Sequence, residues 1–222
     1  MHLALFDLDG TLLSGDSEAL WCAFLIDQGL LDPSFGQRSD EVSRQYVAGT
    51  VNPKTFCDFY ASTVAGQRGA DLRPIRERFL HEVIRPRIPD DSRRLLEKHR
   101  EAGHTLLLTT ATNRVVSELT AQDLGVDHYL CTELEEVDGQ YTGRTTGALN
   151  IRAGKVDRLR TWLAETGQPE TLLKEAHFYT DSINDLALLS VIRQPTVVDP
   201  DARLESAALR KGWNILRLRR GR

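Results

Sequence analysis

The chain has 222 residues, of which 41% are apolar and 27% charged, and a formal net charge of −4, a composition typical of a globular protein with one or two domains. The lack of a basic excess argues against a nucleic-acid-binding protein, and no apolar segment is long enough for a transmembrane helix. The three cysteines form no C-x-x-C pair and there is no signal-peptide pattern, so we expect a cytoplasmic chain with reduced cysteines and neither a disulfide framework nor a cysteine zinc site.

The N-terminal region predicts one strand followed by a helical segment. An apolar run over 3–6 ends at Asp7, and Gly10 follows as a turn residue. The periodicity of apolar residues then predicts a helix over 18–30. Residues 32–87 contain helical patches interrupted by prolines and no strand-like alternation, which indicates a small helical insertion.

The remaining sequence alternates predicted strands with predicted helices. We expect strands over 105–109, 129–132, 177–180, 195–198 and 213–216, helices over 90–102, 113–124, 156–164, 186–190 and 202–209, and a β-hairpin at 137–141. This alternation favours an α/β fold, a Rossmann-like parallel sheet with helices on both faces, with a small helical cap inserted after the first strand. The predicted domains are a core of residues 1–15 and 88–222 and a cap of residues 16–87. The basic segment 217–222 is expected to be a solvated end.

Short polar clusters follow three of the predicted strands. They occupy residues 7–11, 109–113 and 181–185, and Lys155 begins a later helix. Because ligands of parallel sheets bind at the carboxyl ends of the strands, we expect these side chains to share one site.

Two of these clusters supply carboxylates. Asp7 and Asp9 suit a nucleophile and a general acid, provided that their surroundings separate their pKa values. Asp7 and Asp181 suit a hard cation such as Mg²⁺, which takes oxygen ligands. The ordinary alternatives are turn residues at Asp7 and Asp9 and a helix cap at Asp181.

Thr110 and Lys155 suit the binding of an anion. A hydroxyl beside the N–H groups of a helix start forms an anion cradle, and the Lys155 ammonium provides a fixed positive charge. Thr109 is an alternative to Thr110, because the sequence allows the motif to be placed at either residue of the strand end. Each residue alone is commonly an ordinary strand-end or surface residue, but the ordered set favours a shared site.

These residues resemble the haloacid dehalogenase-like hydrolase superfamily, over the whole chain and most closely its phosphoserine phosphatase-like branch. Residues 7–11 match its first motif, Asp-x-Asp-Gly-Thr. Thr110 matches the second motif and Lys155 the third. Asp181 and Asp185 match the fourth motif, in which this chain has Thr-Asp where many relatives have Gly-Asp.

The resemblance implies a Mg²⁺-dependent phosphatase with an aspartyl-phosphate intermediate. In that family the residue matched by Asp7 attacks phosphorus, and the one matched by Asp9 protonates the leaving oxygen and then activates water. Dehalogenases lack the second aspartate, so Asp9 favours a phosphatase. The remaining implied roles are phosphate binding by Thr110 and Lys155, metal binding by Asp7, Asp9, Asp181 and Asp185, and substrate binding by Gly10, Ala111, Asp16 and Asn184.

Asp16 bears on the choice of substrate. It lies where phosphoserine phosphatases carry a glutamate that binds the serine amine, so we expect a small, amine-bearing phosphomonoester, resembling phosphoserine or histidinol phosphate; a helix N-cap is the alternative role. Those phosphatases also use a cap arginine for the substrate carboxylate, and the cap here has Arg38, Arg44, Arg68 and several other arginines, none of which can be matched to it. If none serves, the resemblance favours an amino alcohol phosphate such as histidinol phosphate. Two other functions stay open, a phosphotransferase of the same superfamily and a non-catalytic phosphate-binding regulatory module. We expect no nucleic-acid or membrane partner.

Overall fold

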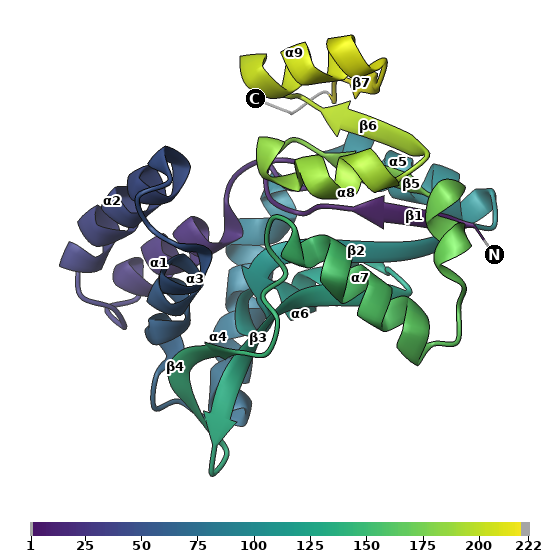
Figure 1. Cartoon of the computed structure of the whole chain (residues 1–222). Coiled ribbons are helices and arrows are strands. Elements are labelled where there is room, and N and C mark those ends of the chain that lie inside the picture. Colours follow the sequence, from purple (N-terminus) through teal and green to yellow (C-terminus); the bar gives the residue numbers. More distant parts are fainter. Residues whose placement is uncertain (1, 219–222) are drawn as a thin grey trace.

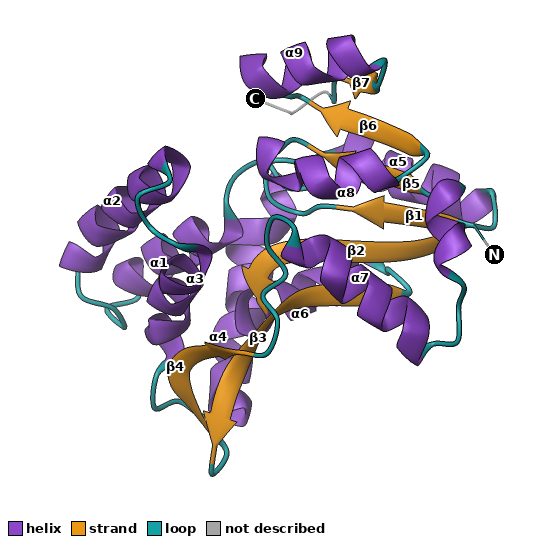
Figure 2. Cartoon of the chain, viewed as in Figure 1, coloured by secondary structure: helices purple, strands orange, loops and turns teal. Residues whose placement is uncertain are grey.

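A seven-stranded sheet forms the centre of the molecule in the computed structural model, which describes residues 2–218. The strand order is β4-β3-β2-β1-β5-β6-β7, and all neighbours are parallel except β3 and β4 (Figures 1 and 2). The strands are β1 (Leu3–Phe6), β2 (Thr105–Asn113), β3 (His128–Val137), β4 (Gln140–Thr146), β5 (His177–Thr180), β6 (Gln194–Val198) and β7 (Asn214–Leu216). The predicted α/β fold is confirmed.

Helices cover both faces of this sheet, since its central strands are apolar on both sides. Ala4 and Phe6 of β1 point into a core shared with α5 (Asp90–Glu101) and α6 (Arg114–Leu124). Leu3 and Leu5 point the other way, toward a second core built with α7, α8 and α9. These three helices span Gly154–Glu165, Leu186–Val191 and Ala202–Lys211.

The segment between β1 and α5 is helical throughout, as predicted. It contains α1 (Ser17–Asp27), α2 (Ser34–Ala48), α3 (Pro53–Ala61) and α4 (Gly69–Phe79), and three short helical turns at Ser62–Val64, Leu80–Ile84 and Arg85–Arg87. Figure 1 shows α1, α2 and α3 beside the sheet, next to the carboxyl ends of its central strands. The exact division into a cap of 16–87 and a core stays a prediction, and residues 1 and 219–222 of that core, with most of the basic segment 217–222, lie outside the described residues.

The antiparallel hairpin β3–β4 supports the cap. The Asp58 carboxylate on α3 accepts hydrogen bonds from the backbone N–H and the hydroxyl of Thr145 on β4, at 2.8 and 2.6 Å. Tyr141 on β4 exchanges backbone hydrogen bonds with Gly66 and Gln67. The sequence predicted a hairpin at this point, but not that it is long enough to reach the cap.

Several elements differ in length from the prediction. Strand β2 continues to Asn113 instead of ending at 109, because Glu18 of the cap binds the N–H of Asn113 and the register to β3 shifts after Thr109. Helix α1 ends at Asp27 because Gly29 takes a left-handed conformation, with a φ of 68°. The three cysteines are buried and form no disulfide, and no helix within 2–218 has the length and apolarity required to cross a bilayer.

Candidate active site

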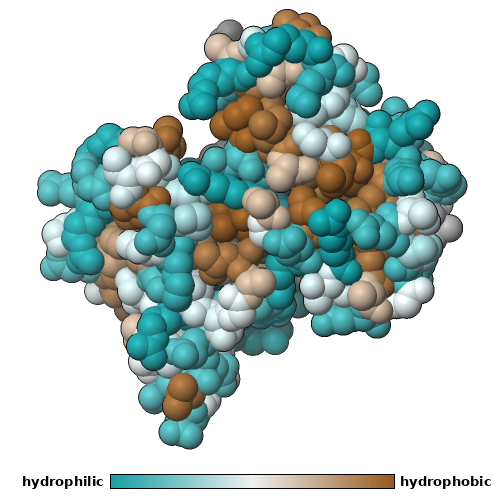
Figure 3. All heavy atoms as spheres, viewed as in Figure 1, coloured by the Kyte–Doolittle hydropathy of each residue, from teal (hydrophilic) through white to brown (hydrophobic). Residues whose placement is uncertain are grey.

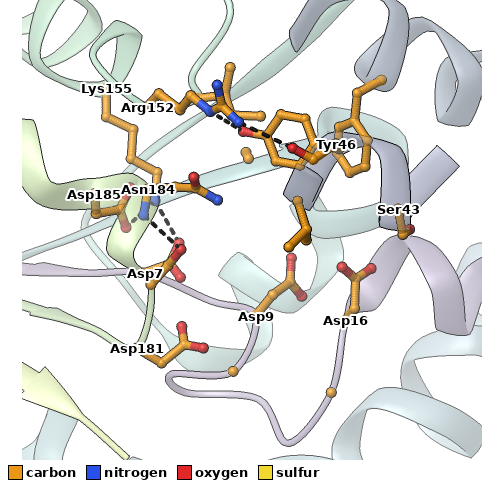
Figure 4. A pocket seen from close by; sticks show the side chains of 17 residues that line it. Asp7, Asp9, Asp16, Ser43, Tyr46, Arg152, Lys155, Asp181, Asn184 and Asp185 are labelled. Carbon is orange, nitrogen blue, oxygen red and sulfur yellow. Dashed lines mark hydrogen bonds and ion pairs between the residues drawn. The ribbon is translucent and has the colours of Figure 1, made fainter. Parts of the chain in front are cut away.

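The carboxyl ends of β1, β2 and β5 open into a pocket of about 390 Å³ between the sheet and the cap helices (Figure 4). Apolar side chains gather between cap and sheet on this face of the molecule, whereas hydrophilic ones cover most of its outer surface (Figure 3). The pocket brings together nine residues predicted from the sequence, Asp7, Asp9, Gly10, Asp16, Ala111, Lys155, Asp181, Asn184 and Asp185.

Lys155 and two carboxylates form a buried charge cluster at the floor of this pocket. The Lys155 ammonium donates to Asp7 Oδ1 at 2.7 Å and to Asp185 Oδ2 at 2.8 Å, and the Thr180 hydroxyl also donates to Asp185. Burial raises the pKa of Asp7, and the charges of Asp185 and Asp181 add to this, while Lys155 opposes it. Burial alone disfavours the ammonium, but the two carboxylates raise the pKa of Lys155. Lys155 is therefore a permanent positive charge beside Asp7.

Asp9 is held by two hydrogen-bond donors, one at the start of α1 and one on β2. Its Oδ1 accepts from the Ser17 N–H at 2.7 Å, and its Oδ2 accepts from the Thr112 hydroxyl at 2.6 Å. Burial and the charge of Asp16 raise the pKa of Asp9 to about 7, although the hydrogen bonds from Thr112 and Ser17 lower it. A carboxyl group with this pKa exchanges protons readily at neutral pH.

Asp181 lies against the turn after β1. Its backbone N–H donates to the Thr11 hydroxyl, which lies 3.0 Å from Asp181 Oδ1 and 3.4 Å from Asp7 Oδ2. Burial raises the pKa of Asp181 to about 6, and the Asp185 charge contributes to this rise. Gly10 is required here, since it has a φ of 70° and a Cβ at this position would lie 2.1 Å from Asp181 Oδ2.

The acidic groups form an oxygen-only donor set. Asp7, Asp181 and Asp185 all line the pocket, and the Lys155 ammonium pairs with two of them, Asp7 and Asp185. Burial raises the pKa values of Asp7 and Asp181, and a hard divalent cation stabilises the charged form of such crowded carboxylates.

Thr110 does not line the pocket directly. It is fully buried, and its hydroxyl accepts from the backbone N–H of Thr112 at 3.2 Å. The Thr109 hydroxyl accepts from the amide of Asn150, which also donates to the carbonyls of Thr110 and Leu130. Thr109 is thus engaged in joining β2 and β3 to the segment before α7, and Thr110 is the residue of the pair that adjoins Ala111 of the pocket.

Sequence reasoning missed Arg152 and Tyr46, which form the basic and aromatic side of the pocket together with Phe56. The Arg152 guanidinium lies 4.4 Å from the centre of the Tyr46 ring, and its Nε donates to the Tyr46 hydroxyl at 2.8 Å. The Tyr46 ring stacks on Phe56 with centroids 4.2 Å apart. No local motif marks these residues, because α2, α3 and the loop before α7 meet only in the folded chain. The cap arginines Arg38, Arg44 and Arg68, none of which the sequence could match to a substrate carboxylate, are not among the residues that line the pocket.

Asp16 combines the two roles that the sequence left open. Its Oδ1 accepts from the N–H of Ala19 at 2.9 Å and caps α1, and the residue also lines the pocket. Figure 4 shows its carboxylate beside that of Asp9. The N-cap role therefore does not remove Asp16 from the pocket.

Comparison with known proteins identifies the family. Residues 4–190 match the model of the haloacid dehalogenase-like hydrolases. The chain is 36% identical to a histidinol-phosphatase of Neisseria meningitidis over 97% of its own length and 98% of the relative's, and 31% identical to the phosphoserine phosphatase SerB1 of Mycobacterium tuberculosis over 96% and 69%. A crystal structure of a protein of unknown function from Bordetella pertussis superposes with a TM-score of 0.91, at 35% identity and 97% coverage of both chains. The predicted family is thus confirmed, and the chain belongs to the haloacid dehalogenase-like hydrolase family.

Proposed function

We propose that this protein is a Mg²⁺-dependent phosphatase that cleaves a small, amine-bearing phosphomonoester through a phosphoryl group carried on Asp7. The observation that carries the proposal is the pairing of two different carboxyls in one pocket. Asp7 is bound to the fixed charge of Lys155, and Asp9 has a pKa of about 7. Two carboxyls with separate environments are the arrangement that divides nucleophile from acid.

In the first step a carboxylate oxygen of Asp7 attacks phosphorus, and the bond between phosphorus and the ester oxygen breaks. Protonated Asp9 gives its proton to that oxygen, so the product leaves as an alcohol. In the second step the Asp9 carboxylate takes a proton from a water molecule, and the oxygen of that water attacks phosphorus. Inorganic phosphate leaves, Asp7 is again a carboxylate, and Asp9 is again protonated.

The remaining groups of the pocket stabilise charge on the phosphoryl oxygens. We assign this role to the Lys155 ammonium and to Ala111 at the end of β2, with Asn184 facing the same pocket. Asp7, Asp181, Asp185 and the Asp9 carbonyl would hold Mg²⁺, which offsets the repulsion between phosphate and the acidic groups when it is bound.

The charge of the pocket favours a cationic leaving group without a carboxylate. Five carboxylates line it, those of Asp7, Asp9, Asp16, Asp181 and Asp185, and the only basic lining side chains among residues 2–218 are Lys155 and Arg152. Both cations are already engaged, Lys155 with carboxylates and Arg152 with Tyr46. The aromatic pair of Tyr46 and Phe56 suits a flat ring. Together with the name of the Neisseria relative, these features favour histidinol phosphate over phosphoserine.

The test is phosphate release with Mg²⁺ from histidinol phosphate, phosphoserine, a sugar phosphate and a nucleotide. We expect the highest kcat/KM on histidinol phosphate, and its loss in Asp7→Asn. Asp40→Asn, an exposed aspartate on α2, is the control and should retain full activity. Preference for phosphoserine would instead assign Arg152 to a substrate carboxylate. Undiminished turnover by Asp7→Asn would contradict the proposed chemistry.

A further inference from the structure

Four of the six histidines of the chain gather at the sheet edge opposite the active site. His99 lies in the last turn of α5, His104 directly precedes β2, His177 begins β5 and His2 precedes β1. A strand rises about 3.3 Å per residue, so His177 lies roughly 13 Å from Asp181 along β5. The cluster is therefore separate from the phosphatase pocket.

The three inner imidazoles face one another at close range. One ring nitrogen from each of His99, His104 and His177 lies within 4.8 Å of the other two. The Nδ1 atoms of His99 and His104 are 2.8 Å apart, and the ring centres of His104 and His177 are 5.2 Å apart in a stacked arrangement. Within residues 2–218, the ring nitrogens of His177 have no hydrogen-bond partner.

The His99 ring is fixed by Tyr179. His99 is buried, with 4% of its surface exposed, and its Nε2 lies 2.8 Å from the Tyr179 hydroxyl. When Nε2 carries the proton and donates to that hydroxyl, the lone pair of Nδ1 points at His104. A histidine whose second nitrogen is held in this way is the usual form of a metal ligand.

We propose that His99, His104 and His177 form a binding site for a divalent transition-metal ion of the zinc class, distinct from the Mg²⁺ site of the phosphatase pocket. Three imidazole nitrogens are ligands that Zn²⁺ accepts and that Mg²⁺ avoids. The fourth tetrahedral position is open to water, because His104 and His177 are only half-buried.

The electrostatic surroundings keep these rings in the form that binds metal. Burial and the neighbouring charges of His177, His104 and Lys98 lower the pKa of His99 to about 4, and burial also lowers the pKa of His104 and His177. The rings are therefore neutral near pH 7, so metal binding needs no net loss of a proton; the proton that His104 Nδ1 shares with His99 Nδ1 would move to His104 Nε2.

The geometry requires small adjustments on binding. Ligand atoms around tetrahedral zinc lie about 3.3 Å apart, at bond lengths of roughly 2.0–2.1 Å. His99 and His104 would separate by about half an ångström, and the half-buried ring of His177 would move closer to both. A bound ion would then join α5, β2 and β5, which meet at this edge.

The test is titration of the chelator-treated full chain with ZnCl₂ in saturating Mg²⁺, followed by calorimetry and by NMR of the histidine ring nitrogens. We expect one Zn²⁺ per chain, a raised Tm, and shifts at His99, His104 and His177. The variant His104→Gln/His177→Gln should bind this ion at least tenfold more weakly. The matched control His81→Gln/His128→Gln changes two histidines outside the cluster and should bind as wild type.

Each readout decides the proposal separately from the phosphatase. The zinc-site proposal would be overturned if the double variant bound Zn²⁺ as tightly as wild type. It would also be overturned if Zn²⁺ left the NMR signals of the ring nitrogens of His99, His104 and His177 unchanged. If the double variant does not fold, the ring shifts of the wild-type chain decide. Neither variant touches the pocket, so both should keep wild-type phosphate release with Mg²⁺.

Discussion

Lys155 Nζ lies 2.7 Å from Asp7 Oδ1, although the two residues are 148 positions apart in the chain. This contact joins the start of α7 to the end of β1, and both partners are buried. It places the permanent positive charge of Lys155 in contact with Asp7, the residue that we propose as the nucleophile.

Replacing Lys155 by methionine tests the role of this cation. The change leaves Asp7 and Asp185 buried without their shared partner, so the free energy of unfolding should fall by about 3–5 kcal/mol. The loss of charge stabilisation should lower kcat by about 10²-fold or more. Chemical denaturation and phosphate release measure the two effects.

Lys54→Met is the matched control for this change. Lys54 pairs with Asp58 on the surface, and its side chain is 58% exposed, so its loss should cost about 1 kcal/mol or less. Equal stability losses in the two variants would contradict a special role for the buried pair.

Replacing Gly10 by alanine tests the turn beside Asp181. Gly10 and Gly29 have nearly the same positive φ, 70° and 68°, but of these two only Gly10 would bring a Cβ within 4 Å of another residue. Both alanine variants should lose about 1–2 kcal/mol of stability from backbone strain. Only Gly10→Ala should weaken Mg²⁺ binding and activity by about tenfold or more, because Asp181 must move. Unchanged Mg²⁺ affinity in Gly10→Ala would contradict this prediction, because it would show that the position of Asp181 does not control Mg²⁺ binding.

The sequence predicted those site residues that follow strands directly. Asp7 and Asp181 come after short apolar runs, and parallel strands bring such positions to one edge. Thr112 and Ser17 could not be predicted, because their roles depend on contacts with Asp9 that only the folded chain creates. Arg152 was missed for the same reason.

The predicted strand lengths failed where tertiary contacts extend the elements. Strand β3 continues to Val137, beyond the apolar run that signalled it, because β4 pairs with its polar end. Asp58 then ties this hairpin to the cap. Such pairing of polar segments leaves little trace in hydrophobic periodicity.

The pKa of Asp9 can be moved in both directions by its neighbours. Catalysis requires protonated Asp9 in the first step, so kcat/KM should fall as the pH rises through about 7. Thr112→Val removes a hydrogen bond that favours the charged form of Asp9, so the fall in kcat/KM should move to higher pH. Asp16→Asn removes a negative charge near Asp9, so the fall in kcat/KM should move to lower pH.

These profiles should be measured on glycerol 2-phosphate, which has no amine for Asp16 to bind. Thr196→Val is the control for Thr112→Val, since Thr196 is a buried strand threonine on β6. Shifts of the same sign in Thr112→Val and Asp16→Asn would contradict Asp9 as the group that titrates.

The histidine cluster makes folding stability depend on pH. The pKa of His99 is lowered to about 4 by burial and by His177, His104 and Lys98, whereas an unfolded histidine has a pKa of about 6.5. Between these values the unfolded chain binds more protons, so the free energy of unfolding falls as the pH drops from 6.5 toward 4. Denaturation in the presence of a chelator should show a flatter dependence for His99→Gln than for wild type. Parallel curves would contradict a neutral, buried His99.

The most direct test of the proposed chemistry is to quench the enzyme with acid during steady turnover of histidinol phosphate and locate phosphoryl groups by peptide mass spectrometry. The mechanism predicts one phosphoryl group on Asp7, and none in Asp7→Asn. Two results would contradict Asp7 as the nucleophile while the wild-type enzyme still releases phosphate. One is a phosphoryl group on another residue. The other is no phosphoryl group on Asp7 under conditions that slow the second step.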